Sequence, residues 1–310
     1  MTDPSQTARH AARPAAPAGA RGGIDLGGTK IEARLFGGSD ARGGPARRLP
    51  TPQGGFDALM GALADQIAWL EAEAGRPDLP VGVAVPGILD PRGGAVIAAN
   101  LPLAGHRLGA ELEARTGRPV AVINDAMAFA LSEARGGAGD GARSVLGLVI
   151  GTGLGAGLCL DGAPAPRHSG LAVEVGHMGI PARALGAHGL PLFDCGCGRR
   201  GCFEGYLSGT GLSNIAEWRL GRRVPADEIR DESVLGIWAD IAGECLAALQ
   251  LLLDPEAIVL GGGVSGMAGI EDRLSDALAA HALAGARAPR IVRAVHGDAS
   301  GARGAALMAC

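Results

Sequence analysis

The stretch GIDLGGTKIEARLF, residues 23–36, decides the fold, because it predicts two short apolar strands joined by a glycine turn. Ile24–Leu26 is the first predicted strand and Ile31–Phe36 the second, with Gly27 and Gly28 between them. Glycine is the residue that most readily adopts the backbone angles of a tight turn. The pair of strands therefore predicts a β-hairpin at the start of an α/β unit.

The same pattern recurs at residues 145–160, where a strand (Ser144–Ile150), a glycine-rich turn (GTGLGAG, 151–157) and a hairpin partner (Leu158–Leu160) follow one another. The two halves share glycine placement and little else, yet the recurrence predicts two similar α/β lobes. We assign 22–124 to the first lobe and 125–298 to the second, and expect a last helix at about 299–310 to pack back on the first lobe. Periodicity and turn residues place the remaining elements: helices at about 56–74 (ending at Gly75), 108–116, from 126, 208–220 and 231–253, and strands at 81–87, 120–125 and 257–263.

Composition fits a globular protein: 47% of the 310 residues are hydrophobic and 19% charged, with a net charge of −4. This charge gives no reason to expect a nucleic-acid or membrane partner. There is no run of 18 apolar residues that would predict a transmembrane helix. Residues 1–21 are rich in Ala, Pro and Arg and lack the apolar region of a secretory signal, so we expect a disordered extension and a cytoplasmic protein.

Two glycine-rich turns are candidates for holding phosphate, DLGGTK (25–30) and GTGLGAGL (151–158). Neither is a Walker A loop, and neither fits a dinucleotide-binding GxGxxG followed by a helix. Each alone could be an ordinary hairpin turn. Together with LGGG at 260–263 they form three glycine-rich strand ends, and their convergence on one nucleotide phosphate is the interpretation that we favour.

Asn124 and Asp125 end a predicted strand and begin a helix, which leaves two interpretations open. Both residue types favour helix N-caps. A carboxylate held rigidly at this position could also accept a proton from a substrate hydroxyl as that hydroxyl attacks phosphorus.

His177, Cys195, Cys197 and Cys202 form a set of four ligands that predicts a structural zinc site. The CxC spacing does not fit a CxxC redox centre, and free thiols beside a chance histidine are the remaining alternative. Glu174 and Glu204 lie close to this set in the sequence. They are ordinary surface charges unless the zinc loop, residues 177–202, holds them against a ligand rich in hydroxyl groups.

The motifs DLGGTKIEA, NDA, GTGLGAGL, EVGH and CGCGRRGCFE together resemble the ROK family of sugar kinases and repressors, over nearly all of residues 22–310. The resemblance implies an actin/hexokinase-type (ribonuclease H-like) two-lobe ATPase fold with a zinc-binding loop. It is strongest to members that phosphorylate N-acetyl-D-glucosamine with ATP. Glucose, N-acetylmannosamine and fructose remain alternative substrates. A sugar-responsive repressor is disfavoured, because the first 21 residues carry no helix-turn-helix pattern.

The resemblance also implies roles for individual residues. Asp125 would be the general base on the sugar 6-hydroxyl, Asp25 would lie near Mg²⁺, and the chain would form a homodimer. Met127 stands where the family usually has Asn, which removes a polar group near the base. The implied sugar contacts are Asn100, Asn124, Asp125, Glu174, His177 and Glu204, with His177 also binding zinc. The implied ATP contacts are Gly23, Ile24, Asp25, Leu26, Gly27, Gly28, Thr29, Lys30, Gly151, Thr152, Gly153, Leu154, Gly155, Ala156, Gly157, Leu158, Gly261, Gly262 and Gly263.

Overall fold

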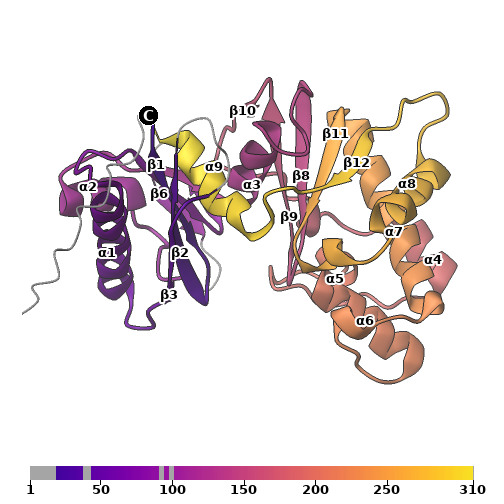
Figure 1. Cartoon of the computed structure of the whole chain (residues 1–310). Helices are drawn as coiled ribbons and strands as arrows, with labels where there is room; N and C mark the ends of the chain where they lie inside the picture. Colours follow the sequence, from indigo (N-terminus) through magenta and orange to yellow (C-terminus); the bar gives the residue numbers. More distant parts are fainter. Residues whose placement is uncertain (1–18, 38–42, 91–93, 98–100, 310) are drawn as a thin grey trace, which may run out of the picture.

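The computed structural model describes residues 19–37, 43–90, 94–97 and 101–309, so most of the expected N-terminal extension lies outside the described residues. Two five-stranded sheets, each with helices, form two lobes side by side (Figure 1). The first sheet has the order β3 (Ala46–Pro50), β2 (Lys30–Phe36), β1 (Arg21–Leu26), β4 (Val81–Val85) and β7 (Ala121–Asn124). The second has the order β10 (Ala163–Pro164), β9 (Leu154–Leu160), β8 (Ser144–Ile150), β11 (Ala257–Gly261) and β12 (Arg290–Arg293).

The two sheets repeat one topology, as the recurring glycine hairpin predicts. In each, an antiparallel three-stranded meander is extended by two strands that run parallel to its first strand. In the first sheet, Ile24 lies opposite Ala33 on the antiparallel side and opposite Val83 on the parallel side. A small separate hairpin, β5 (Ile88–Asp90) with β6 (Gly94–Ile97), follows β4.

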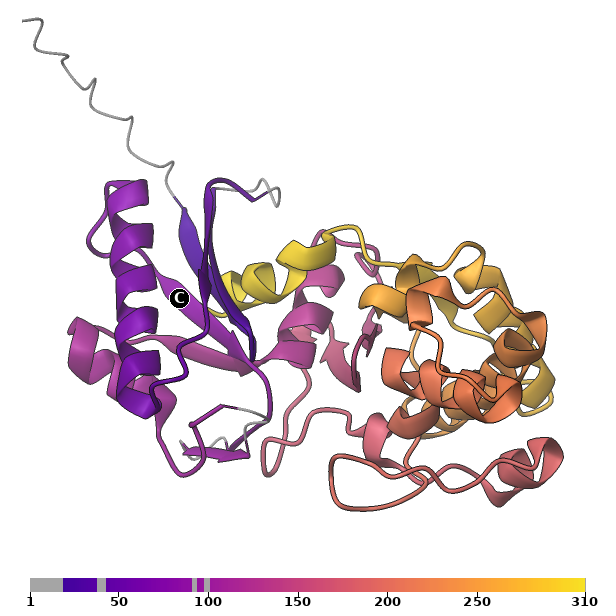
Figure 2. The ribbon, with the colours of Figure 1, turned by 90° about the horizontal axis from the view of Figure 1, so that it is seen from below.

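Helix α1 (Phe56–Ala74) covers the outer face of the first sheet with α2 (Leu108–Thr116) beside it (Figure 2). Its buried residues recur every three or four positions, and it ends at Gly75 in the left-handed conformation with φ 61°, as predicted. The outer face of the second sheet is covered by a larger layer of helices. These are α5 (Glu204–Leu207), α6 (Gly209–Leu220), α7 (Glu232–Leu253) and α8 (Ile270–His281), with α4 (Ala182–His188) against α7.

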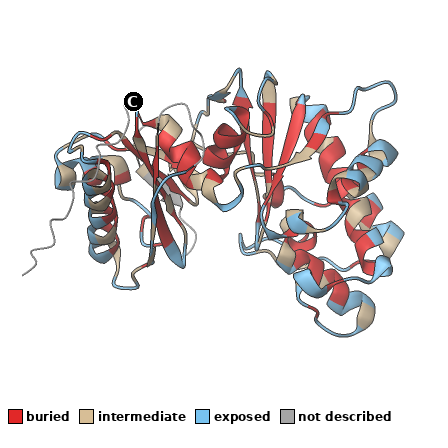
Figure 3. Ribbon diagram, in the orientation of Figure 1, coloured by how far each residue is buried: buried red, intermediate tan, exposed pale blue. Residues whose placement is uncertain are grey.

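Two helices lie between the sheets and join the lobes: α3 (Asp125–Ala134) and α9 (Ser300–Met308) (Figure 1). Every residue of α3 after Asp125 is buried, in line with its central position (Figure 3). The helices cross closely, because a Cβ on Gly304 would lie 1.9 Å from the carbonyl oxygen of Ala128. On its other side α9 packs on the first sheet, where Gly23 and Gly82 leave room for its backbone.

Among the described residues, short 3₁₀ turns lie at η1 (Val175–His177), η2 (Ala226–Glu228), η3 (Gly263–Gly266) and η4 (Gly297–Ala299). By length and composition α7 could cross a membrane, but 72% of its apolar 18-residue stretch is buried inside the protein. It is the central helix of the second lobe's core, which includes the fully buried Trp238.

The predicted turn at 151–157 is shorter than expected. Strand β9 begins at Leu154, so Gly155 and Gly157 lie within the strand. Gly157 is required for packing, because a Cβ there would lie 2.3 Å from the carbonyl oxygen of Ala126 in α3. The sequence prediction also missed several elements that are short or carry only a weak apolar pattern: β3, β5, β6, β10, β12, α4, α5 and α8.

Candidate active site

Asp125 is the first residue of α3, and its carboxylate is fixed by its neighbours. Asn124 is the helix N-cap: its Oδ1 accepts a hydrogen bond of 3.0 Å from the Met127 N–H. The Asn124 amide nitrogen donates to the carbonyl oxygen of Gly87 at 2.9 Å and to Asp125 Oδ1 at 2.9 Å. Asp125 Oδ1 also accepts from the Ala126 N–H at 2.8 Å. The sequence left open whether this pair caps the helix or presents a carboxylate. In the structure, Asn124 caps the helix and Asp125 carries the oriented carboxylate.

The surroundings of Asp125 favour a carboxylate that accepts protons. Burial raises its pKa above the ordinary value, and the nearby charge of Glu174 adds to the rise. Hydrogen bonds from Ala126 and Asn124 act in the opposite direction but do not cancel the rise. A higher pKa makes a carboxylate a stronger base, which suits proton abstraction from a hydroxyl group.

Asp25, in β1, is a second carboxylate with unusual electrostatics. Burial raises its pKa to about 7, and the charges of Asp125 and Glu32 add to this effect, while Lys30 opposes it. The N-terminus of α9 lies over this carboxylate, since a Cβ on Gly301 would come within 2.7 Å of Asp25 Oδ2. Two mutually repelling carboxylates, one from β1 and one from α3, are an arrangement that a divalent cation would stabilise.

This electrostatic strain predicts a pH-dependent effect of Asp25→Asn. Asp25 binds its proton more tightly in the folded than in the unfolded chain, so the free energy of unfolding falls as the pH rises from 3.8 to about 7. Asparagine removes this fall. We expect the variant to match the wild type near pH 4 and to exceed it by up to about 4 kcal/mol at pH 8. Urea unfolding across this range without added magnesium measures the difference, and a difference that does not change with pH would contradict the assignment.

The other candidate sugar contacts gather around the first two residues of β9. Ala126, beside Asp125, lies over Gly155, with its Cβ 3.6 Å from where a Cβ on that glycine would be. The 3₁₀ turn η1 passes so close that a Cβ on Gly176 would lie 2.2 Å from the carbonyl oxygen of Leu154. Glu204 reaches the same point, accepting a hydrogen bond of 3.0 Å from the Leu154 N–H. The start of β9 therefore brings Asp125, Glu174, His177 and Glu204 to one place.

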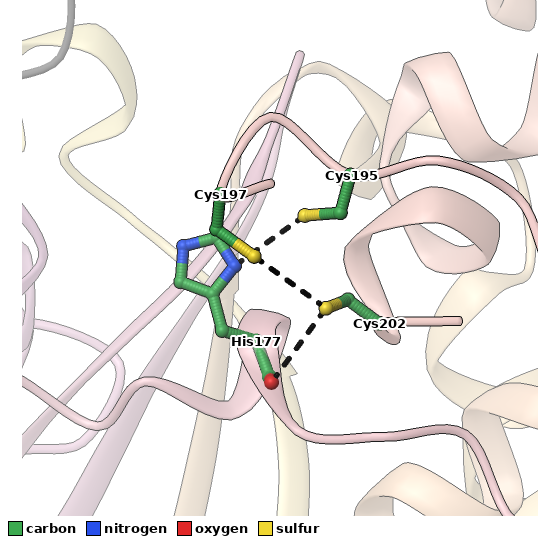
Figure 4. A group of neighbouring side chains, drawn as sticks. All are labelled: His177, Cys195, Cys197 and Cys202. Carbon is green, nitrogen blue, oxygen red and sulfur yellow. Dashed lines mark hydrogen bonds between the residues drawn. The ribbon is translucent and has the colours of Figure 1, made fainter. Parts of the chain in front are cut away.

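His177, Cys195, Cys197 and Cys202 converge as predicted, and one ligand atom from each lies within 4.8 Å of all the others (Figure 4). Backbone pairing aligns the two ends of the loop: Ile180 N–H donates to Gly201 O at 2.8 Å, and Phe203 N–H to Met178 O at 2.9 Å. These bonds place Cys202 opposite the segment that carries His177.

The spacing of these atoms fits zinc. Cys197 Sγ lies 3.7 Å from Cys202 Sγ, and His177 Nδ1 lies 3.6 Å from Cys195 Sγ. A tetrahedral zinc ion with Zn–S of about 2.3 Å and Zn–N of about 2.05 Å gives S···S of about 3.8 Å and S···N of about 3.6 Å. Three thiolates and one imidazole are a donor set typical of structural zinc sites. Cys195 Sγ also lies 3.6 Å from Glu204 Oε1, so the cluster adjoins the proposed sugar contacts.

Of the three glycine-rich strand ends, the structure brings two together. Gly262, with φ 82°, packs against the end of β8, where a Cβ would lie 2.8 Å from the Gly151 nitrogen. The turn at 151–153 is also joined to the start of α6, because Gly209 N–H donates to Gly151 O at 2.7 Å. The turn at 27–29 belongs to the other lobe and is held by Thr51, whose hydroxyl donates to Gly27 O at 2.7 Å.

Other residues predicted for the site are either outside the described residues or buried in the protein. Asn100 is outside the described residues. Ile24, Leu26, Ala156 and Leu158 are buried in the sheets. Met127 is buried between α3 and β9, where its sulfur accepts a hydrogen bond of 3.4 Å from the Leu158 N–H. The thioether therefore fills the core under α3, which accounts for an apolar residue at this position.

Sequence reasoning missed Arg167, which lies in the loop after β10. Two of its side-chain nitrogens, Nε and Nη2, are buried without a hydrogen-bond acceptor, and among the described residues it is the one such arginine that also lacks an ion pair. Burial lowers its pKa, and the nearby charge of Glu174 acts in the opposite direction. Its cation thus lies near the Glu174 carboxylate. No periodicity or motif marks this position in the sequence.

Comparison with known proteins agrees with this geometry. The ROK family model matches residues 21–310. An N-acetyl-D-glucosamine kinase from Escherichia coli O157:H7 is 40% identical over 298 residues, which is 92% of this chain and 98% of that protein. The crystal structure of a ROK hexokinase from Thermus thermophilus superimposes with a TM-score of 0.79 at 35% identity, over 94% of this chain and 97% of that one.

A second solved structure is a ROK glucokinase from Streptomyces griseus in complex with glucose and AMPPNP. It superimposes with a TM-score of 0.76 at 29% identity, over 94% of this chain and 99% of that chain. The predicted hexokinase-type two-lobe fold is confirmed by these superpositions and by the repeated sheet topology. With its family model matched over almost the whole described chain and its histidine–cysteine cluster assembled, this chain belongs to the ROK family.

Proposed function

We propose that this ROK-family sugar kinase transfers the γ-phosphate of ATP to the 6-hydroxyl of N-acetyl-D-glucosamine. The observation that carries the proposal is the fixed Asp125 carboxylate, with its raised pKa, beside Glu174 and at the start of β9. Such a group can accept a hydroxyl proton without moving. A neighbourhood of further carboxylates suits a ligand that offers hydroxyl groups as donors.

In the proposed reaction, Asp125 accepts the proton of the 6-hydroxyl as its oxygen attacks the γ-phosphorus, and the bond to the bridging oxygen of ADP breaks. Phosphoryl transfer depends mainly on positioning and on neutralising charge. We expect the turns at 27–29 and 151–153 to approach phosphate oxygens with their backbone, because the glycines there carry no side chain. Magnesium, when bound, would neutralise phosphate charge, and Asp25 is the carboxylate that we expect nearest to it.

The preference for N-acetyl-D-glucosamine is supported by the relatives at about 40% identity that carry this name. We further propose structural zinc at His177, Cys195, Cys197 and Cys202, sugar contacts from Glu174, His177 and Glu204, and lobes spanning 22–124 and 125–298. A cytoplasmic homodimer completes the proposal, and light scattering of the purified protein would test the dimer.

The test of the substrate is a comparison of kcat/KM for ADP release with N-acetyl-D-glucosamine, glucose, N-acetylmannosamine and fructose. We expect N-acetyl-D-glucosamine to lead by at least about tenfold, the discrimination that one good hydrogen bond provides. Mass spectrometry of the product, before and after a 6-phosphate-specific enzyme, locates the phosphate. Preference for glucose would replace the proposed substrate, and no ADP release with any sugar would refute the kinase assignment.

A further inference from the structure

Helix α4 lies inside the zinc loop, five residues after His177 and seven before Cys195. It has seven residues, of which Ala184 alone is fully buried, and no side chain caps its N-terminus. Two turns of helix are not stable in isolation. The helix therefore depends on what it contacts, and its packing partner is α7 (Figure 1).

Two side chains at opposite ends of α4 bind two carboxylates on α7. Arg183 Nε donates to Glu244 Oε1 at 2.6 Å, and its Nη2 donates to the other oxygen, so the pair is bidentate. His188 Nε2 lies 2.7 Å from Asp240 Oδ2. Asp240 and Glu244 are four residues apart on α7, so they lie on one face of that helix, one turn from each other.

His281, at the end of α8, also belongs to the cluster and contacts both carboxylates. Its Nε2 lies 2.8 Å from Asp240 Oδ1 and its Nδ1 lies 3.4 Å from Glu244 Oε1. Gly243 permits this approach, because a Cβ there would lie 2.6 Å from the imidazole ring. Arg183, His188 and His281 thus surround the two carboxylates of α7 in this cluster.

Because Glu244 is buried, its contacts depend on where α4 lies. The Glu244 side chain is 6% exposed, and without Arg183 it would lose its bidentate partner in a buried place. Burial acts to raise the pKa of Asp240, but the hydrogen bonds and charges of His188 and His281 outweigh it and hold that pKa below its ordinary value. Without Arg183, whose own side chain is largely exposed, the buried Glu244 charge would lack this partner, which is costly. The contacts of both carboxylates therefore favour the observed position of α4.

After α4 the chain leads directly to the zinc ligands. Tyr206, two residues beyond Glu204, donates its hydroxyl to Pro191 O at 2.8 Å and accepts from the Phe193 N–H at 3.2 Å. The segment between α4 and Cys195 is thus held at both ends, by the α7 carboxylates and by Tyr206.

We propose that Asp240 and Glu244 are positioning residues for the sugar site: by holding α4 through His188 and Arg183, they place the zinc loop that presents His177 and adjoins Glu204. The inference rests on the proposed function for its kinetic consequence. Its structural part, the retention of zinc and the order of α4, does not depend on which sugar is bound.

Asp240→Asn tests the proposal, because it keeps the size of the side chain and removes the charge. A cavity of about 540 Å³ beside Asp240 and His281 lets water reach the altered group, which favours folding of the variant. Glu232→Gln is the matched control: it lies on the same helix and pairs with Arg273 of α8 at 2.9 Å, but its ion-pair partner is on α8 and not on α4.

We expect Asp240→Asn to release zinc to a chelating dye about tenfold faster than the wild type, the effect of one lost charge-assisted hydrogen bond. Amide hydrogen exchange of residues 182–188 should rise by a similar factor. The KM for the sugar should rise about fivefold while kcat changes less than about twofold, because the reacting groups are intact. Glu232→Gln should leave all four quantities near wild type.

His188→Asn provides a second variant, and the two substitutions combined should cost no more than Asp240→Asn alone, since both break the same contact. Zinc release and exchange equal to those of Glu232→Gln would overturn the proposal, as would additive effects in the double variant. If zinc release accelerates but no sugar is phosphorylated even by the wild type, the proposed function fails and the positioning of the zinc loop stands.

Discussion

Asp125→Asn is expected to lower kcat for sugar phosphorylation by about a thousandfold or more, with little change in sugar affinity. General base catalysis typically contributes a factor of about 10² to 10⁴. Asparagine cannot accept the hydroxyl proton, so most of this factor is lost. Isothermal titration of the sugar and single-turnover kinetics with ATP would separate binding from chemistry.

The fold should tolerate this substitution, because asparagine keeps an oxygen where Asp125 Oδ1 accepts from Ala126 and Asn124. Asp231→Asn is a matched control, since Asp231 is also an aspartate at a helix N-terminus and accepts from the Ser233 N–H at 2.8 Å. That variant lies at the start of α7 and should retain full turnover. An Asp125→Asn enzyme within tenfold of wild-type kcat would show that another group is the base.

The paired glycine hairpins were enough to predict the two lobes, because a strand, a glycine turn and a returning strand impose the same meander wherever they occur. The roles of individual glycines could not be predicted. Gly157 looks like a phosphate-binding residue in the sequence, yet the backbone of α3 occupies the space that a side chain there would need. This steric constraint acts between α3 and β9, at residues about 30 positions apart, so the local sequence pattern does not reveal it.

The zinc ligands were predictable because their chemistry is marked by residue type and spacing. The electrostatics of the site were not. The pKa of Asp25 rises to about 7 partly because Asp125, a hundred residues later, lies close to it. The surroundings of Arg167 and of the α7 carboxylates are likewise set by residues that are distant in the sequence. Helix α8 was missed because three buried residues, Ile270, Leu274 and Leu278, are its whole apolar stripe.

Cys197→Ser is expected to reduce zinc from one ion per chain to less than about a fifth of that, because a serine hydroxyl is not a thiolate and three ligands rarely hold a structural ion. Cys197 is exposed, so its replacement leaves no cavity and its effect reports the metal alone. Metal analysis of protein purified without chelators measures the ratio.

Loss of the ion should weaken sugar binding more than it lowers the stability of the fold. The second lobe's core meets the cluster at Val175, Ile180 and Phe203 but extends over many other elements, whereas His177 is itself a ligand and Glu204 lies 3.6 Å from Cys195 Sγ. The KM for the sugar should therefore rise by about tenfold or more, as found when groups that orient a metal site are removed. Cys159→Ala, a buried cysteine of β9 outside the cluster, should keep both zinc and KM. A zinc-free wild type with full activity would mean that hydrogen bonds within the loop suffice to hold His177 and Glu204 in place.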